Sequence, residues 1–168
     1  MKTRYYQLLV SQFQWQISEE KIVTAWGFNQ MLPGPTLKAE KGDTLVVKVI
    51  NNLAEPTVIH WHGIQLPAAM DGTDLVQKPI ASGEECVYRF VVPDAGTFWY
   101  HAHHNETVQM ERGMYGSLIV IDPQDPLVDD DKIFMIDDMK LNAENEFARG
   151  NFITRWIERH DGRGEAPC

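Results

Sequence analysis

Residues 84–103 decide the fold, and their sequence is EECVYRFVVPDAGTFWYHAH. Within Glu84–Val92 the apolar side chains recur at every second position, which places them on one face of an extended chain. A Pro-Asp-Ala-Gly turn at 93–96 leads into Thr97–His103, which is rich in aromatic residues. This stretch therefore predicts two successive β-strands joined by a turn.

The same period of two continues along most of the chain and predicts further short strands. These strands are expected over Tyr6–Trp15, Ile22–Asn29, Asp43–Asn52, Thr57–His62 and Tyr115–Ile121. Pro33 and Gly34 predict a type II turn, because glycine tolerates the positive φ that this turn requires at its third position. No helical period exceeds about two turns, so the pattern favours an all-β sandwich or barrel.

The composition changes after this block. Residues 123–131 contain two prolines and three consecutive aspartates and predict an acidic linker between a domain at 1–122 and a segment at 132–168. Lys132–Asp138 is strand-like again, and Phe147–Arg159 carries apolar residues at helical spacing. We interpret 132–168 as a short C-terminal extension, which is either the start of a truncated second domain or a docking segment.

Composition and charge exclude several classes of partner. The chain has 168 residues and a net charge of −9, so it repels phosphate backbones and nucleic acid is not expected as a partner. No apolar run is long enough to span a membrane. Two distant cysteines do not form a disulfide framework or a zinc ribbon. No signal peptide is expected at the N-terminus, and the compartment stays unknown.

Histidines form two His-X-His pairs in strand-like sequence, His60/His62 and His101/His103. On a strand, residues i and i+2 project from the same face roughly 7 Å apart, so each pair presents two imidazoles side by side. Neutral imidazole suits zinc, copper, iron and nickel, and copper binds such ligands most tightly. His104 falls on the opposite face and His160 has polar neighbours, so neither is expected to bind a metal.

A series of ordered motifs resembles the N-terminal domain of the multicopper oxidases, which include laccases, ascorbate oxidase and bacterial copper-efflux oxidases. The series comprises Pro33-Gly34-Pro35-Thr36, Gly42-Asp43, His60-Trp61-His62-Gly63, Asp71-Gly72, Gln77-x-Pro79-Ile80, Ser82-Gly83, Tyr88-x-Phe90, Gly96–His103 and Gly113-x-x-Gly116. The resemblance covers roughly Tyr5–Asp122 and implies a cupredoxin-like Greek-key β-sandwich.

The resemblance also implies a role for each paired histidine. In this family eight histidines hold a trinuclear copper cluster that reduces oxygen, and the first domain supplies four of them. His60 corresponds to the ligand of the type 2 copper. His62 and His101 correspond to ligands of one type 3 copper, and His103 to a ligand of the other. Asp71 matches an acidic residue that relays protons, although an Asp-Gly pair is also typical of a plain turn.

One part of a complete oxidase is missing from the sequence. The type 1 copper site needs a cysteine flanked by histidine, and no His-Cys-His occurs. Cys86 lies on a core-facing strand position and is expected to act as a small buried hydrophobe, and Cys168 has no ligands nearby. We therefore expect part of an oxidoreductase that takes copper ions and other cupredoxin domains, or identical subunits, as partners.

Three alternatives remain open at this point. The chain could be a stand-alone copper-binding domain whose histidines meet across identical subunits. A mononuclear zinc or cupin-type site would want a carboxylate beside a histidine pair, and Glu106 is the nearby candidate. A structural sandwich without chemistry is disfavoured by the two pairs.

Overall fold

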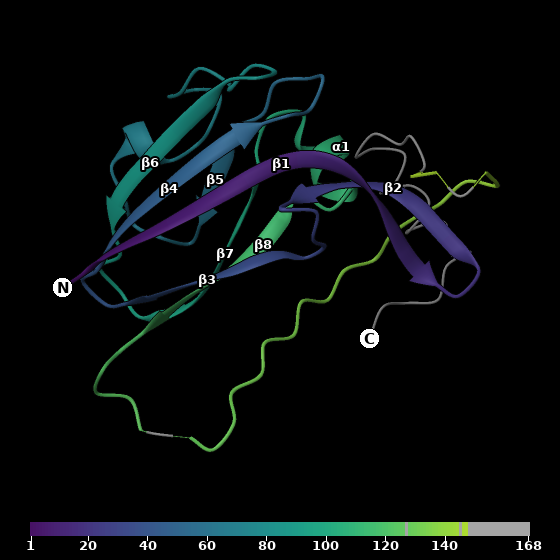
Figure 1. Ribbon diagram of the computed structural model, residues 1–168. Coiled ribbons are helices and arrows are strands. Elements are labelled where there is room, and N and C mark those ends of the chain that lie inside the picture. The colour runs from purple at the N-terminus through teal and green to yellow at the C-terminus, as the bar shows by residue number, and fades with distance from the viewer. Residues whose placement is uncertain (127, 145, 148–168) are drawn as a thin grey trace, which may run out of the picture.

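The computed structural model describes residues 1–126, 128–144 and 146–147, and within these ranges eight strands form two four-stranded sheets (Figure 1). The strands are β1 (Thr3–Ser18), β2 (Lys21–Phe28), β3 (Gly34–Glu40), β4 (Thr44–Asn51), β5 (Ile59–His62), β6 (Glu85–Val91), β7 (Gly96–Ala102) and β8 (Tyr115–Ile121). Two short helices, η1 (Ala68–Met70) and α1 (Glu106–Glu111), lie in the connections. The predicted all-β sandwich is confirmed.

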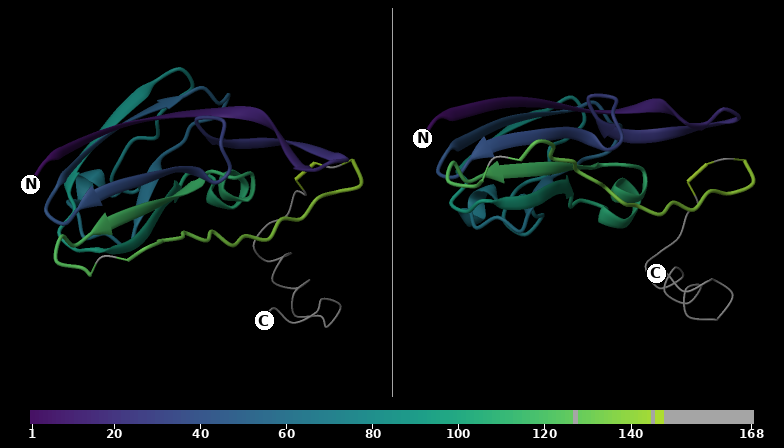
Figure 2. Two further views of the ribbon diagram at one scale, coloured as in Figure 1. Left: turned by 60° about the horizontal axis from the view of Figure 1, so that its bottom comes forward. Right: turned by 90° about the horizontal axis from the view of Figure 1, so that it is seen from below.

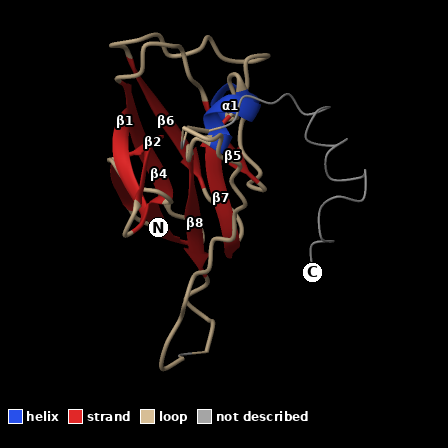
Figure 3. Cartoon of the chain, turned by 90° about the vertical axis from the view of Figure 1, so that its right-hand side faces the viewer, coloured by secondary structure: helices blue, strands red, loops and turns tan. Residues whose placement is uncertain are grey.

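The two sheets have the strand orders β2-β1-β4-β6 and β3-β8-β7-β5. Strands that are neighbours in a sheet are mostly not neighbours in the sequence, and the pairs β1–β4 and β3–β8 are parallel. Figure 3 shows the two sheets edge on, packed face to face as layers of a sandwich. Strands β5 and β7 therefore lie together at one side of the second sheet, where both predicted histidine pairs occur.

The core forms between the sheets because side chains alternate along each strand. In β4 the buried positions are Leu45, Val47 and Val49, each completely shielded from solvent. Three large aromatic side chains, Trp61, Tyr88 and Tyr100, fill the middle of the sandwich and are also fully buried. The single apolar face predicted for Glu84–Val92 is confirmed at Tyr88, Phe90 and Val92, which are all buried.

The backbone around Gly34 differs from the turn predicted there. The peptide Leu32–Pro33 is cis, and Gly34 begins strand β3 with ordinary negative φ, so the predicted type II turn is wrong and β3 was not anticipated. A Cβ atom on Gly34 would lie 2.8 Å from the Tyr100 hydroxyl and 2.9 Å from the Phe28 ring. Glycine is required there by close packing rather than by backbone conformation.

The segment after β8 also differs from its prediction. Lys132–Asp138 forms no strand, because no partner strand lies beside it among the described residues. Its side chains Phe134 and Ile136 are 80% and 94% exposed, and the Asp137 carboxylate accepts a 2.6 Å hydrogen bond from the Tyr115 hydroxyl. Figure 2 shows this segment running as an extended tail along the sandwich. The predicted helix Phe147–Arg159 lies almost wholly outside the described residues.

Strands β1 and β2 continue beyond the sandwich as a two-stranded hairpin (Figures 1 and 2). One face of this hairpin is apolar and forms a second small cluster with residues near the described end of the chain. The cluster contains Phe13, Trp15, Ile17, Val23, Ala25, Leu32, Met139, Leu141 and Phe147. Among the described residues, no helix has the length and apolar character needed to cross a membrane.

Asp43 joins the start of β4 to the N-terminus. Its carboxylate accepts hydrogen bonds from the Arg4 Nε atom at 2.8 Å and from the backbone N–H groups of Lys2 and Glu40. The Arg4 side chain, followed by these backbone donors, lowers the pKa of Asp43 from 3.8 to about 2.

We expect this carboxylate to stabilise the fold at neutral pH and to lose that effect in acid. Because its folded pKa is depressed, its contribution is complete above pH 3.8 and disappears as the pH falls through about 2. Urea midpoints of wild type and Asp43→Asn, measured from pH 6 to pH 2, should differ clearly at pH 6 and approach each other as the pH falls from 3.8 to about 2. A constant gap over this range would contradict the assignment.

Candidate metal centre

Strands β5 and β7 pair antiparallel with His60 directly opposite His101. Trp61 and Tyr100 alternate with these histidines and point into the core, where both are fully buried. The histidines consequently share the other face of the sheet, away from the core. The ladder of the sheet therefore brings together two pairs that lie about 40 residues apart in the sequence.

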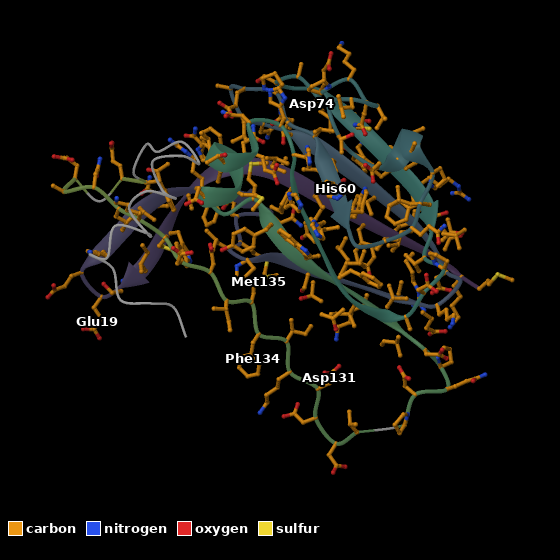
Figure 4. All side chains as sticks on the ribbon, turned by 180° about the vertical axis from the view of Figure 1, so that it is seen from behind. Glu19, His60, Asp74, Asp131, Phe134 and Met135 are labelled. Atoms are coloured by element: carbon orange, nitrogen blue, oxygen red, sulfur yellow. The ribbon has the colours of Figure 1, made fainter. Side chains whose placement is uncertain are left out.

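The four imidazole rings form one compact cluster. The His60 ring lies closest to the centre, with ring centroids 5.5, 5.3 and 5.4 Å from those of His62, His101 and His103. The ligand nitrogens of His60, His62 and His101 all lie within 4.8 Å of one another. All four histidines predicted as ligands are thus brought together, and His60 can be located in Figure 4 on β5.

Backbone carbonyls orient two of the rings. The Nδ1–H group of His60 donates to the carbonyl oxygen of Asp71 at 2.7 Å, and that of His101 donates to the carbonyl oxygen of Ala102 at 2.9 Å. A carbonyl can only accept, so each of these rings carries a proton on Nδ1, which leaves Nε2 as the nitrogen that can bind a metal. Metal-binding histidines commonly have this arrangement, with the second nitrogen held by an outer partner.

His101 is the most deeply buried of the four, with 2% of its surface exposed. Burial lowers its pKa from 6.5 to about 4; the Ala102 carbonyl opposes this shift, and the neighbouring His60, His62 and His103 add to it. The ring is therefore neutral at physiological pH. Its Nε2 atom lies 3.3 Å from His62 Nδ1, and because the His101 proton is on Nδ1, the His62 N–H group donates to His101 Nε2.

This donor set fits copper. Neutral imidazole nitrogens are borderline ligands that copper binds more tightly than other divalent first-row metals do. Within the part of the chain that the structure describes, the nearest carboxylate oxygens are 3.6 Å or more from the ring nitrogens, so the inner donors there are nitrogen alone. The donor atoms of the cluster are therefore of a type that copper binds.

Asp71 lies beside the cluster as predicted, but its closest contact is through the backbone. Its carbonyl holds His60, while its carboxylate Oδ1 atom lies 3.6 Å from His60 Nδ1 and the side chain is 37% exposed. Gly72 follows with φ of +72°, so the Asp-Gly pair does form a turn. Asp71 and Gly72 therefore form a turn, and the same turn places the Asp71 carbonyl against His60.

Three neighbours of the cluster were missed or set aside by sequence reasoning. The Trp99 ring stacks on His101 with centroids 4.3 Å apart, and the period of two on β7 could have placed it there. Glu106 brings a carboxylate to within 4 Å of two histidines. His104 points elsewhere, as predicted, and its Nδ1 atom lies 2.9 Å from Asp74 Oδ2.

Cys86 lies on the other sheet, on β6. Its side chain is partly buried against the core, and the Gln77 side-chain amide donates to its Sγ atom at 3.6 Å. Burial raises the pKa of the thiol, so it is protonated at neutral pH. These contacts agree with its interpretation as a small hydrophobe.

Comparison with known proteins gives one consistent family. The family model described as multicopper oxidase matches residues 9–125. A multicopper oxidase of Mycobacterium tuberculosis, MmcO, is 42% identical over 118 residues, which cover 70% of this chain and 23% of that protein. The L-ascorbate oxidase of Cucurbita maxima is 39% identical over 157 residues, covering 84% of this chain and 27% of that enzyme. The chain thus spans about a quarter of these curated relatives.

Solved structures agree. Lac15 from a marine microbial metagenome superposes with a TM-score of 0.77 at 39% identity, covering 84% of this chain and 38% of that one. A multicopper oxidase from Pseudomonas thermotolerans gives a TM-score of 0.71 at 40% identity, covering 73% and 30%. The predicted cupredoxin-like sandwich is confirmed by these neighbours, and copper is the metal that their family binds.

Proposed function

This chain belongs to the multicopper oxidase family, and from that premise we propose that it supplies four of the eight histidines of a trinuclear, oxygen-reducing copper cluster. The observation that carries the proposal is the meeting of two His-X-His pairs on the adjacent strands β5 and β7. The four ligands are His60, His62, His101 and His103.

The division of these ligands among the copper ions follows the family motif. We assign His60 to the type 2 copper, His62 and His101 to one type 3 copper, and His103 to the other. The 3.3 Å approach of His62 Nδ1 and His101 Nε2 supports the shared assignment, because a cation that replaced the proton between them would be within reach of both nitrogens. The central position of the His60 ring is compatible with a role apart from that pair.

Copper bound at this site would supply the electron transfer needed to reduce oxygen to water. The residues of this chain orient the ligands and handle protons. The Asp71 carbonyl keeps the His60 ring in one tautomer, and the partly exposed Asp71 carboxylate is placed to pass protons between solvent and the site. The Trp99 indole packs against the His101 ring and shields one side of the cluster from water.

We further propose that electrons and the remaining ligands come from another domain or subunit. Cys86, the cysteine within the sandwich, has no histidine beside it in the sequence, so a type 1 site is not expected in this domain. The relatives are about four times longer than the matched region. In this view residues 1–122 form the first domain, 123–131 a linker, and 132–168 the beginning of the next domain or a docking extension.

A second candidate is a mononuclear site of zinc or cupin type. It is favoured by one observation, the approach of the Glu106 carboxylate to His101 and His103. A third arrangement places the four histidines at the contact between identical subunits. Metal content per chain and the mass of the particle in solution distinguish these candidates from a domain of a larger oxidase.

The test of the proposed function is copper binding by the paired histidines. Isothermal titration of wild type and of the double variant His60→Ala/His62→Ala should show an affinity at least about 100-fold weaker in the variant, since two direct ligands are lost. The matched control is His104→Ala, which removes a neighbouring histidine whose ring contacts Asp74 instead of the cluster.

His104→Ala is expected to keep nearly the wild-type affinity. Equal copper affinity in wild type and the double variant would show that the pairs are not the site. Preference for one zinc ion per chain over copper would favour the mononuclear candidate.

A further inference from the structure

Helix α1 is fixed beside the metal centre by one buried side chain, Gln109. Its amide accepts a 2.8 Å hydrogen bond from the Thr57 hydroxyl and donates to the Glu55 carboxylate at 2.7 Å and to the Pro56 carbonyl at 2.8 Å. Gln109 is fully buried, and each of its polar atoms is satisfied. Because these partners precede β5, the helix is tied to the strand that carries His60 and His62.

The first residue of this helix is Glu106, whose carboxylate faces the cluster. Its Oε1 atom lies 3.8 Å from His101 Nδ1, and its Oε2 atom lies 3.9 Å from His103 Nε2. Both distances exceed hydrogen-bond length, so the carboxylate acts on the rings through its charge rather than as a bonded acceptor. The Asp71 carboxylate approaches a different ring of the cluster, with Oδ1 3.6 Å from His60 Nδ1.

We propose that Glu106 is the charge-balancing carboxylate of the four-histidine centre and stabilises bound cations from the side of His101 and His103. The proposal rests on the proposed function, because it requires cations among the histidines. Four neutral imidazoles bring no negative charge to offset a divalent ion. Asp71 supplies one carboxylate at the His60 side, and Glu106 supplies the second at the other side, where the family motif assigns none.

The test measures copper affinity at low and high salt. Glu106→Gln keeps the shape and removes the charge, and we expect about tenfold weaker copper binding at low ionic strength. Glu106 is 45% exposed, so its effect is partly screened, and the ratio between wild type and variant should shrink between about 0.02 M and about 0.5 M salt. Glu106→Asp keeps the charge and should retain most of the affinity.

Glu19→Gln is the matched control, because it changes the net charge equally at the far tip of the β1–β2 hairpin. Figure 4 shows Glu19 well away from His60. The control should bind copper as wild type does, and all variants should unfold at the wild-type temperature.

Three results would overturn the role of Glu106. They are wild-type affinity in Glu106→Gln, an equal loss in Glu19→Gln, or a loss that does not change with salt. If any of these occurs while His60→Ala/His62→Ala still loses copper, the proposed function stands and the charge-balancing role alone fails. If wild type binds no copper, both proposals fail.

Discussion

Replacing Gly72 with alanine is expected to destabilise the protein and to disturb the metal centre at the same time. Gly72 has φ of +72°, a conformation that costs a residue with a side chain about 1–3 kcal/mol. A Cβ atom there would also overlap the backbone carbonyl of Ile59, which belongs to β5. Neither backbone can yield without moving its neighbours, so we expect a total loss of roughly 3–5 kcal/mol.

The effect on metal binding follows from the same overlap. The loop that carries Gly72 also carries the Asp71 carbonyl, which orients His60, and the overlapped carbonyl immediately precedes His60 on β5. Relief of the overlap must therefore move the ring or its partner. Copper affinity of the folded fraction should fall together with the free energy of unfolding.

Gly83→Ala is the control for this substitution. Gly83 has φ of +78°, but a Cβ atom there would meet no atom within 4 Å. The variant therefore keeps the backbone strain without the overlap and should lose only about 1–3 kcal/mol, with wild-type copper affinity. Equal losses of stability in the two variants would mean that the overlap at Gly72 contributes nothing.

Trp61→Ala is the second substitution with a large expected effect. Trp61 lies between His60 and His62 on β5, is fully buried, and contacts the rings of Tyr88 and Phe90 at centroid distances of 5.3 and 5.0 Å. Truncating such a side chain leaves a cavity between the sheets and costs about 3–5 kcal/mol. The midpoint of urea unfolding should fall accordingly, measured by circular dichroism.

Trp99→Ala provides the comparison, because Trp99 lies on the histidine face of the same sheet and is only half-buried. It should cost much less stability and weaken copper binding more directly, since its ring stacks on His101. Below the urea concentration at which it begins to unfold, Trp61→Ala should bind copper nearly as wild type does. A larger loss of stability in Trp99→Ala than in Trp61→Ala would contradict the division of this sheet into a core face and a histidine face.

The shared face of each histidine pair could be predicted from the sequence because it depends on a local rule. Alternation places His60 with His62, and His101 with His103, on one face of its own extended stretch, and the pairing of β5 with β7 then brings the two pairs together. The burial of His101 and the position of Glu106 could not be predicted in this way. They depend on where α1 packs, and α1 is placed by the long-range contacts of Gln109.

The two errors in the predicted strands, the missed β3 and the expected strand at Lys132–Asp138, have the same physical cause. At Gly34, the first residue of β3, Tyr100 and Phe28 leave room only for glycine, and a local turn signal contains no information about those rings. Lys132–Asp138 has the apolar composition of a strand but no partner strand within the described residues, so it forms no strand in the structure. In both cases distant contacts decided the outcome over local propensity.

The parallel pairing of β3 with β8 has a consequence for the order of events during synthesis. It joins Gly34 to Gly116, and β8 is also the inner neighbour of β7. A nascent chain on the ribosome that has not yet exposed residue 121 contains every histidine of the centre but lacks the strand that supports β7. Because pairings of such high sequence separation slow folding, we expect the four histidines to come together only after β8 has joined the second sheet.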